Sequence, residues 1–320
     1  MKKLLVICGP TATGKTSLGI KLAKKISPKG RPASGWNGEI VSADSRQVYK
    51  QMDIGTGKEW GDVKIWGYDL VELKDGFSVS EYFNQMKWVV EDIWSRDKLP
   101  IIVGGTGLYI KSLIDGIQTV DIPKNINLRK TLEELSVDAL FEKLATLDST
   151  KAAALNSSDR QNPRRLVRAI EVASWKIENE TKNSEVVKRS KVLSADVSVL
   201  QIGLTSNLNF LKSKIKERVM DRINNGFIDE VEDLLKNGVS WKMQSMKSLG
   251  YKEAEAFFKQ GLSFEEFIEI WERNEVNYVK RQMTWFKKDK RIIWFDIEND
   301  DYLKAVENTV KKWYSTTNAT

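Results

Sequence analysis

The sequence predicts an α/β protein in which helices flank a parallel β-sheet and an all-helical domain is inserted into the chain. Short apolar runs of strand length, such as Leu4–Cys8, alternate with segments whose apolar residues recur at helical spacing. From residue 118 to 195 the strand patterns give way to residues typical of helices, and a strand pattern returns at Ser198–Leu204. We therefore expect a core of residues 1–117 and 196–320 and a helical insertion of residues 118–195.

Composition narrows the class of protein. The 320 residues are 41% apolar, enough for a substantial core, and 51 Lys and Arg against 44 Asp and Glu give a net charge of +7. This excess suits a polyanionic partner such as nucleic acid, and is also common in ordinary cytosolic proteins. A single cysteine, Cys8, excludes a disulfide framework, and no apolar run is long enough to span a membrane. We expect a cytoplasmic monomer without a membrane partner.

The segment between the first strand and the first helix fits the phosphate-loop pattern Gly-x-x-x-x-Gly-Lys-Ser/Thr. In such a loop backbone N–H groups at a helix N-terminus hold phosphate oxygens, the lysine reaches the outer phosphates and the hydroxyl can hold Mg²⁺. The predicted sheet is therefore P-loop NTPase-like, and an ordinary strand-to-helix turn is the disfavoured alternative. The residues are Gly9, Pro10, Thr11, Ala12, Thr13, Gly14, Lys15 and Thr16.

Further candidate residues follow other predicted elements. Because carboxyl ends of parallel strands face the ligand crevice, Asp44 after strand Glu39–Ala43 is expected to point at the bound phosphate, although a capping or turn role stays open. Thr106, among three glycines after strand Leu99–Val103, suggests close approach of backbone to ligand, with a capped tight turn as the alternative. The chain has no histidine, so chemistry must use carboxylates, hydroxyls, cations and a metal.

Three predicted helices carry cationic residues that could bind an anionic ligand. Arg218 borders the buried stripe of a long helix and needs an anion, which is either a bound diphosphate or a structural carboxylate. Arg164 and Arg168 share a helical face that is either solvated or lies along phosphates. Lys280 and Arg281 are interleaved with aromatic residues, which could stack on bases, but their helical spacing places most of those aromatic residues in the core.

The sequence predicts further loops, strands and helices of the α/β protein. A polar loop is expected at Ser27–Asn37 and a charged mobile segment at Glu178–Lys191. The expected third strand is Lys64–Val71, the last strand is Arg291–Asp296, and the further helices are Val79–Trp94, Lys124–Leu135, Val137–Leu147 and Asn162–Ile177.

Seven motifs follow one another along the chain in a definite order and spacing. They are Gly9–Thr16, Ala43–Tyr49, Asp53–Lys58, Gly104–Tyr109, Arg165–Glu171, Gly250–Glu253 and Lys280–Phe286. In this order and spacing they resemble the tRNA dimethylallyltransferases, the isopentenyltransferases that prenylate adenosine beside the anticodon. The resemblance runs from Leu4 to about Phe295 and is to the bacterial type.

The resemblance implies transfer of a dimethylallyl group from dimethylallyl diphosphate to N6 of the adenosine 3′ of the anticodon, with Mg²⁺. Asp44 would be the general base, Thr106 and Arg218 would contact the diphosphate, and Thr16 would face Mg²⁺. The insertion would grip the anticodon arm, and the target base would flip into the cleft. The implied tRNA contacts are Asp44, Ser45, Arg46, Gln47, Thr106, Arg129, Arg164, Arg165, Arg168, Lys280, Arg281 and Gln282.

Three positions depart from the family pattern, and three other functions stay open. Trp66-Gly67-Tyr68-Asp69 stands where many members carry a His-His pair, Asn162 stands for an Asp before the Arg-rich helix, and the loop Ser27–Asn37 is long. The alternatives are a small-molecule kinase that uses ATP, an adenylate isopentenyltransferase that prenylates free AMP or ADP, and a non-enzymatic RNA-binding protein. The insertion argues against the adenylate enzyme.

Overall fold

The computed structural model describes residues 1–25, 38–117, 119–179 and 196–316. The chain forms two compact units, which we call the core unit (residues 1–115 and 193–320) and the insert unit (residues 116–192). Their boundaries differ by two and three residues from those expected from the sequence. The expected loop Ser27–Asn37 and most of the expected charged segment, from residue 180 on, lie outside the described residues.

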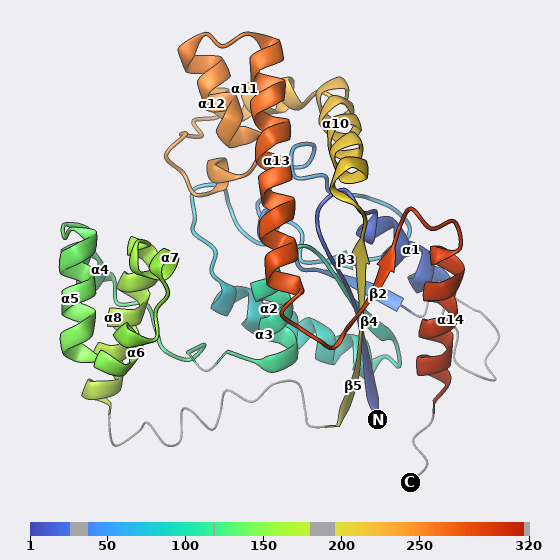
Figure 1. Ribbon diagram of the computed structural model, residues 1–320, viewed down its shortest axis with the longest axis horizontal. Helices are drawn as coiled ribbons and strands as arrows, with labels where there is room; N and C mark the ends of the chain where they lie inside the picture. The colour runs from blue at the N-terminus through green and yellow to red at the C-terminus, as the bar shows by residue number, and fades with distance from the viewer. Residues whose placement is uncertain (26–37, 118, 180–195, 317–320) are drawn as a thin grey trace. The chain divides into compact units, whose positions relative to one another are not determined.

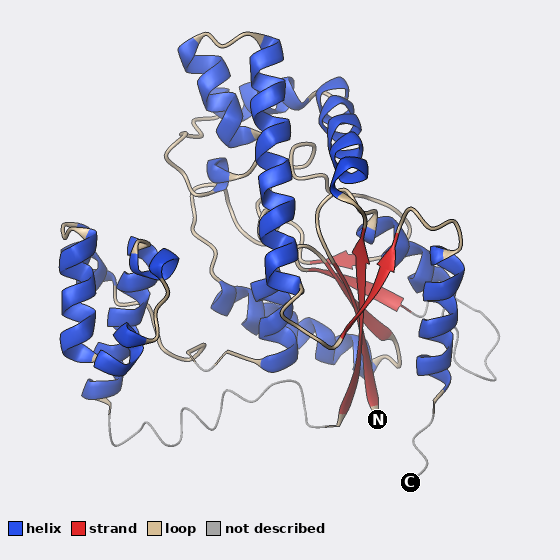
Figure 2. Cartoon of the chain, viewed as in Figure 1, coloured by secondary structure: helices blue, strands red, loops and turns tan. Residues whose placement is uncertain are grey.

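A six-stranded sheet forms the centre of the core unit (Figure 2). Its strands are β1 (Lys2–Cys8), β2 (Gly38–Ser42), β3 (Ile65–Trp66), β4 (Leu99–Val103), β5 (Val197–Thr205) and β6 (Ile292–Asp296). The order is β3-β2-β4-β1-β5-β6, and every neighbouring pair is parallel. Leu5 of β1 lies opposite Ile101 on one side and Leu200 on the other. The strand that leads into the phosphate loop is therefore central, which confirms the predicted P-loop-like sheet.

Helices cover both faces of this sheet (Figure 1). One face carries α1 (Lys15–Lys25) and α14 (Tyr302–Ser315), and the other carries α2 (Val79–Ser95) and α3 (Gly107–Asp115). Leu5 and Ile7 of β1 point to the first face and pack in one cluster with Leu22 of α1 and Val306 of α14. Because both faces are covered, the central strands are apolar at successive positions.

Two elements differ from the sequence-based expectation. The third strand was expected over residues 64–71 but β3 is only Ile65–Trp66. Gly67 at φ +93° and Asp69 at φ +54° turn the backbone out of the extended conformation there. Helix α14 was not expected at all, although its Val306 and Val310 are spaced by four residues and are both buried against the sheet.

Four helices of the core unit stand beyond the sheet and frame the site. They are α10 (Leu208–Asn224), α11 (Phe227–Lys236), α12 (Tyr251–Gln260) and α13 (Phe264–Phe286). Phe227, Phe267 and Trp271 are fully buried there, with the Phe227 and Trp271 ring centroids 4.6 Å apart. Of the aromatic residues predicted for the core in this part of the chain, Phe267, Trp271 and Phe286 are buried, whereas Phe264 is 37% and Trp285 43% exposed.

The described part of the insert unit, residues 116–117 and 119–179, contains helices and no strand. Its helices are α4 (Ile126–Glu133), α5 (Val137–Leu147), α6 (Ser149–Ala153), α7 (Ser157–Arg160) and α8 (Pro163–Glu178). Leu140 and Leu144 of α5 pack with Leu166 and Ile170 of α8 in a core of its own. Asn162 caps α8, since its side chain accepts the N–H of Arg165 at 3.3 Å. The amide thus supplies the cap that the family pattern assigns to an Asp.

Candidate active site

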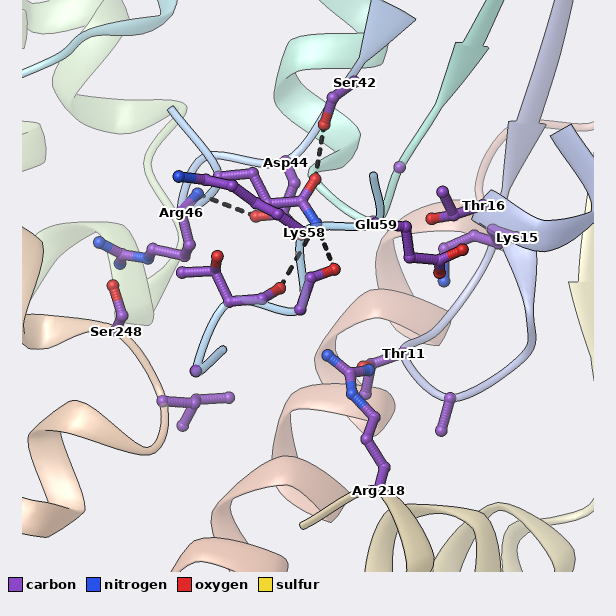
Figure 3. Close-up of a pocket in the computed structure, with 18 of the residues that line it drawn as sticks. Thr11, Lys15, Thr16, Ser42, Asp44, Arg46, Lys58, Glu59, Arg218 and Ser248 are labelled. Atoms are coloured by element: carbon purple, nitrogen blue, oxygen red, sulfur yellow. Dashed lines mark hydrogen bonds between the residues drawn. The ribbon is translucent and has the colours of Figure 1, made fainter. Parts of the chain in front are cut away.

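A pocket of about 890 Å³ lies at the carboxyl ends of the central strands. The phosphate loop follows β1, Asp44 follows β2, and Gly104 follows β4, and all three line this pocket or border it. Arg218 of α10 closes it from the helical side, as Figure 3 shows. The parallel strands and α10 therefore bring into one site residues as far apart in the sequence as Thr11 and Arg218, which are 207 positions apart.

The phosphate loop has a backbone that its glycines make possible. Gly9 has φ +131° and Gly14 φ +73°, and a Cβ on Gly9 would lie 2.3 Å from the carbonyl oxygen of Leu204. Thr13 Oγ1 donates to the carbonyl oxygen of Pro10 at 2.9 Å, and α1 begins at Lys15. The loop thus presents the start of a helix to the pocket, as an anion-binding loop requires.

Two cations converge on this loop. Arg218 donates from Nη1 to Thr11 Oγ1, and the Lys15 ammonium donates to the carbonyl oxygen of Pro10. Burial and, next to it, the charge of Arg218 lower the pKa of Lys15 to about 8, and the charge of Asp44 opposes this shift. An anion bound between the two cations would relieve their repulsion. Arg218 therefore lies where the resemblance places a diphosphate contact.

Sequence reasoning missed a third cation of the pocket. Arg222, one helical turn after Arg218, is only 6% exposed and pairs with Glu275 at 3.3 Å. Burial lowers the pKa of Arg222 to about 10, with Arg218 as the next cause. The spacing of four residues from Arg218 was the signal that could have found it.

Asp44 is held at the pocket wall by its own turn. Its Oδ1 accepts the backbone N–H of Arg46 at 2.8 Å, an Asx turn that fixes the carboxylate. Burial raises the pKa of Tyr278, and the negative charge of Asp44 raises it further. Burial likewise raises the pKa of Tyr109, with Asp44 among the charges that add to the shift. The carboxylate thus lies near buried phenols, and its turn directs it at the pocket.

Thr106 holds the Asp44 turn in place. Its hydroxyl accepts the backbone N–H of Ser45 at 3.0 Å and lies 3.3 Å from the Ser45 hydroxyl. Its own N–H donates to the carbonyl oxygen of Ala43 at 3.0 Å. Thr106 therefore positions the segment that carries Asp44, and its predicted diphosphate contact stays a prediction.

The glycines around Thr106 serve the protein's own packing. A Cβ on Gly104 would lie 2.2 Å from the carbonyl oxygen of Ala43, and a Cβ on Gly107 would lie 2.1 Å from the Trp285 ring. The expectation that these glycines admit a ligand to the backbone is corrected here for Gly107. What approaches it is the indole of α13, which a sequence without partner information cannot reveal.

Two glutamines expected to contact tRNA are buried and bonded within the core unit. Gln282 accepts the N–H of Thr11 at 2.9 Å and donates to the carbonyl oxygen of Gly105 at 3.0 Å. Gln47 accepts from the Ser42 hydroxyl at 2.7 Å and donates to the carbonyl oxygen of Gly57. Gln282 and Gln47 are only 5% and 7% exposed, and their hydrogen bonds connect neighbouring loops. Their contacts with tRNA stay predictions.

The other expected tRNA contacts of the core unit are more accessible. Lys280 and Arg281 are exposed on α13, and Arg281 lies 5.5 Å from the centroid of the Tyr278 ring. Arg46 and Ser45 are half-buried, and Arg46 donates to the carbonyl oxygen of Gln244 at 3.4 Å. These side chains are available to a polyanion at the pocket or beside it.

The four arginines of the insert unit that were expected to contact tRNA divide into two pairs. Arg129 and Arg168 both donate to the buried carboxylate of Glu171, at 2.8 and 2.5 Å. Burial acts to raise the pKa of Glu171, but the hydrogen bonds from Arg129 and Arg168 outweigh it and lower that pKa to about 2. Arg165 pairs with Asp159 and is 58% exposed, and Arg164 is exposed as well. Arg164 and Arg165 can therefore bind a ligand without disrupting the buried contacts of the insert unit.

The pocket can supply oxygen ligands to Mg²⁺. Thr16, in the first turn of α1, and the carboxylates of Asp44 and Glu59 line it, and Mg²⁺ commonly takes one or two carboxylates together with substrate phosphates. Within residues that the structure describes, no group of three or more His, Cys, Asp or Glu gathers to hold a metal. The same described part of the chain contains no helix long and apolar enough to cross a membrane.

Comparison with known proteins gives a consistent result. The model of the IPP transferase family matches residues 47–289. A protein of Anoxybacillus flavithermus named tRNA dimethylallyltransferase is 37% identical, covering 97% of this chain and 95% of the relative. The tRNA isopentenylpyrophosphate transferase of Bacillus halodurans has a crystal structure with a TM-score of 0.69 and 32% identity, covering 98% of this chain and 97% of that chain. A eukaryotic dimethylallyltransferase, at 23% identity and a TM-score of 0.77, shares the fold.

Proposed function

We propose a tRNA prenyl transfer for this chain, which belongs to the IPP transferase family. The chain takes a dimethylallyl group from dimethylallyl diphosphate and places it on N6 of the adenosine 3′ of the anticodon, in tRNAs that read U-initial codons. The names of the relatives specify transfer to tRNA. This favours tRNA over free AMP or ADP as the acceptor, and transfer over the kinase alternative.

One observation carries the proposal: a strand-end carboxylate and a cation-flanked phosphate loop face the same pocket. The loop and the cations Lys15 and Arg218 suit a diphosphate, whose negative charge grows as it leaves. Asp44 suits an acceptor amine, whose proton must be removed. Neither the phosphate loop with its cations nor the Asp44 carboxylate alone would distinguish this reaction from other reactions of phosphate-loop proteins.

The roles follow from the contacts. Lys15 and Arg218 hold the diphosphate oxygens and stabilise the charge that develops when the bond between oxygen and the first prenyl carbon breaks. The N6 lone pair forms the new bond to that carbon, diphosphate leaves with the electron pair, and Asp44 accepts the N6 proton. Thr106 and the Arg46 N–H keep Asp44 in position.

Mg²⁺ is part of the proposal. Thr16 would hold it beside the loop, and the ion would neutralise charge on the diphosphate oxygens. For the tRNA, cations of both units are the proposed contacts, namely the half-buried Arg46 and the exposed Arg164, Arg165, Lys280 and Arg281.

Transfer of label tests the proposal directly. Purified chain is incubated with Mg²⁺ and labelled dimethylallyl diphosphate, in parallel with unmodified tRNA that reads a U-initial codon, with AMP and with ATP. We expect label in the tRNA alone, at the adenosine 3′ of the anticodon. Label on AMP would identify an adenylate enzyme, and ATP consumption without label transfer would identify a kinase.

A further inference from the structure

We propose that Glu59 supplies the carboxylate of the Mg²⁺ site at the phosphate loop, opposite the Thr16 hydroxyl. This inference rests on the proposed function, because the ion is bound together with the diphosphate. It assigns a metal-site role to a residue outside the phosphate loop, in a segment that the motifs of the sequence leave unexplained.

Glu59 belongs to the loop that precedes β3, and its side chain lies on the side of the pocket where α1 begins. It lines the same pocket as Lys15 and Thr16, and Figure 3 shows its carboxylate directed to the side of the pocket where those two residues lie. The side chain of Ser17, the residue that follows Thr16, is near enough to act on the Glu59 carboxyl group and favours its ionised form. The carboxylate therefore reaches the first helical turn, where the hydroxyl of a phosphate loop meets its metal.

The backbone around Glu59 is anchored on both sides. Before it, the fully buried ammonium of Lys58 donates to Asp53 and Asp69, each at 2.6 Å. After it, the Trp60 ring packs edge-on against the Tyr68 ring, with centroids 5.4 Å apart. The Glu59 side chain thus extends into the pocket from a fixed origin, which favours a defined ligand position.

Most other carboxylates of the pocket are paired with cations. Asp53 pairs with Lys58, Glu217 pairs with Lys214, and Glu275 pairs with Arg222. Asp221 also lines the pocket, from α10. Asp44 is held in its turn at the end of β2 and is needed as a base. Glu59 is the pocket carboxylate that contacts α1, so it is the one suited to share an ion with Thr16.

A bound Mg²⁺ would explain why the Glu59 carboxylate lies in a pocket that binds the anionic diphosphate. Glu59 is exposed at the pocket, and the cation Arg218 lines the same pocket. An ionised Glu59 repels a bare diphosphate. A Mg²⁺ ion between them turns that repulsion into attraction, because Mg²⁺ takes oxygens from carboxylates and phosphates together.

The test compares the binding of inorganic diphosphate with and without Mg²⁺, by calorimetry, in the wild-type chain and in Glu59→Gln. We expect the variant to need at least about tenfold more Mg²⁺ for half-maximal binding, as loss of a group that supports a metal typically causes. Without Mg²⁺ the variant should bind diphosphate as tightly as the wild type or more tightly. Electron paramagnetic resonance of Mn²⁺ in the presence of diphosphate should show the same loss of metal affinity.

Glu217→Gln is the matched control, because it removes the same charge from the same pocket at a carboxylate that pairs with Lys214. It should leave the Mg²⁺ requirement unchanged. An unaltered Mg²⁺ requirement in Glu59→Gln, or equal shifts in both variants, would overturn the role of Glu59 while leaving the proposed function intact. A wild-type chain that binds no diphosphate would overturn the proposed function, and this inference with it.

Discussion

At the scale of single residues, Asp44 offers the clearest separation of catalysis from binding. Its Oδ1 accepts the N–H of Arg46, and an Asn side chain can keep that hydrogen bond while losing the base. We expect Asp44→Asn to lower the single-turnover rate by roughly 10²- to 10⁴-fold, the usual contribution of a general base. Affinity for tRNA, measured by filter binding, should change little. A variant that keeps near wild-type turnover would remove Asp44 from the chemistry.

The pKa of Lys15 gives a pH dependence with a definite sign. Burial and Arg218 lower it to about 8 in the empty pocket, and a bound diphosphate raises it again. Affinity for the diphosphate is thus fully present well below pH 8 and falls as the pH rises through that value, by up to about tenfold per unit. Calorimetry across this range should show the fall in the wild type. Lys15→Arg, which stays charged, should show a flatter profile, and identical profiles would contradict the assignment.

The sequence identified the residues whose type and place are fixed by a local pattern. The phosphate loop, Asp44 and Arg218 follow from a motif, a strand end and a helical stripe, and all line the pocket. Gln282 was assigned to tRNA, but its amide bonds Thr11, which is 271 positions away in the chain. Such a contact depends on how distant segments pack, which no local pattern encodes.

At the scale of elements, the insert-unit arginines should separate stability from binding. Arg168 donates to the buried Glu171 and to the carbonyl oxygens of Thr119 and Ile122. Removing one partner of such a network leaves buried acceptors unpaired, so Arg168→Ala should cost about 2–4 kcal/mol in urea unfolding followed by circular dichroism. The exposed Arg164 should lose less than about 0.5 kcal/mol on replacement by Ala.

The same pair of variants should behave differently with tRNA. Arg164→Ala should weaken tRNA binding without changing the free energy of unfolding. Arg168→Ala should lower the free energy of unfolding, and any loss of tRNA affinity in that variant should come with this destabilisation. An Arg164→Ala variant that unfolds as readily as Arg168→Ala would show that the exposed arginine is structural as well.

The elements themselves were predictable where hydrophobic periodicity was long and uninterrupted. Helix Val137–Leu147 and strand Leu99–Val103 have the expected bounds. Strand β3 is shorter than expected because left-handed backbone at Gly67 and Asp69 overrides the extended propensity of its neighbours. Helix α14 was missed although Leu303, Val306, Val310 and Trp313 recur at helical spacing, and their packing against the sheet stabilises it.

At the scale of the whole molecule, the net charge of +7 and the exposed cations of both units predict salt-sensitive tRNA binding. Each phosphate contact adds roughly 0.7 to 0.9 to the slope of log affinity against log salt. Arg164→Ala in the insert unit and Arg281→Ala in the core unit should each lower that slope by about one, and the double variant by about two. Lys311→Ala, an exposed cation on α14, is the control for charge alone and should leave the slope unchanged. A tRNA that engages both units must release counterions from both sets of cations. If only one unit binds, one of the single variants should leave the slope unchanged, and the double variant should have the same slope as the other.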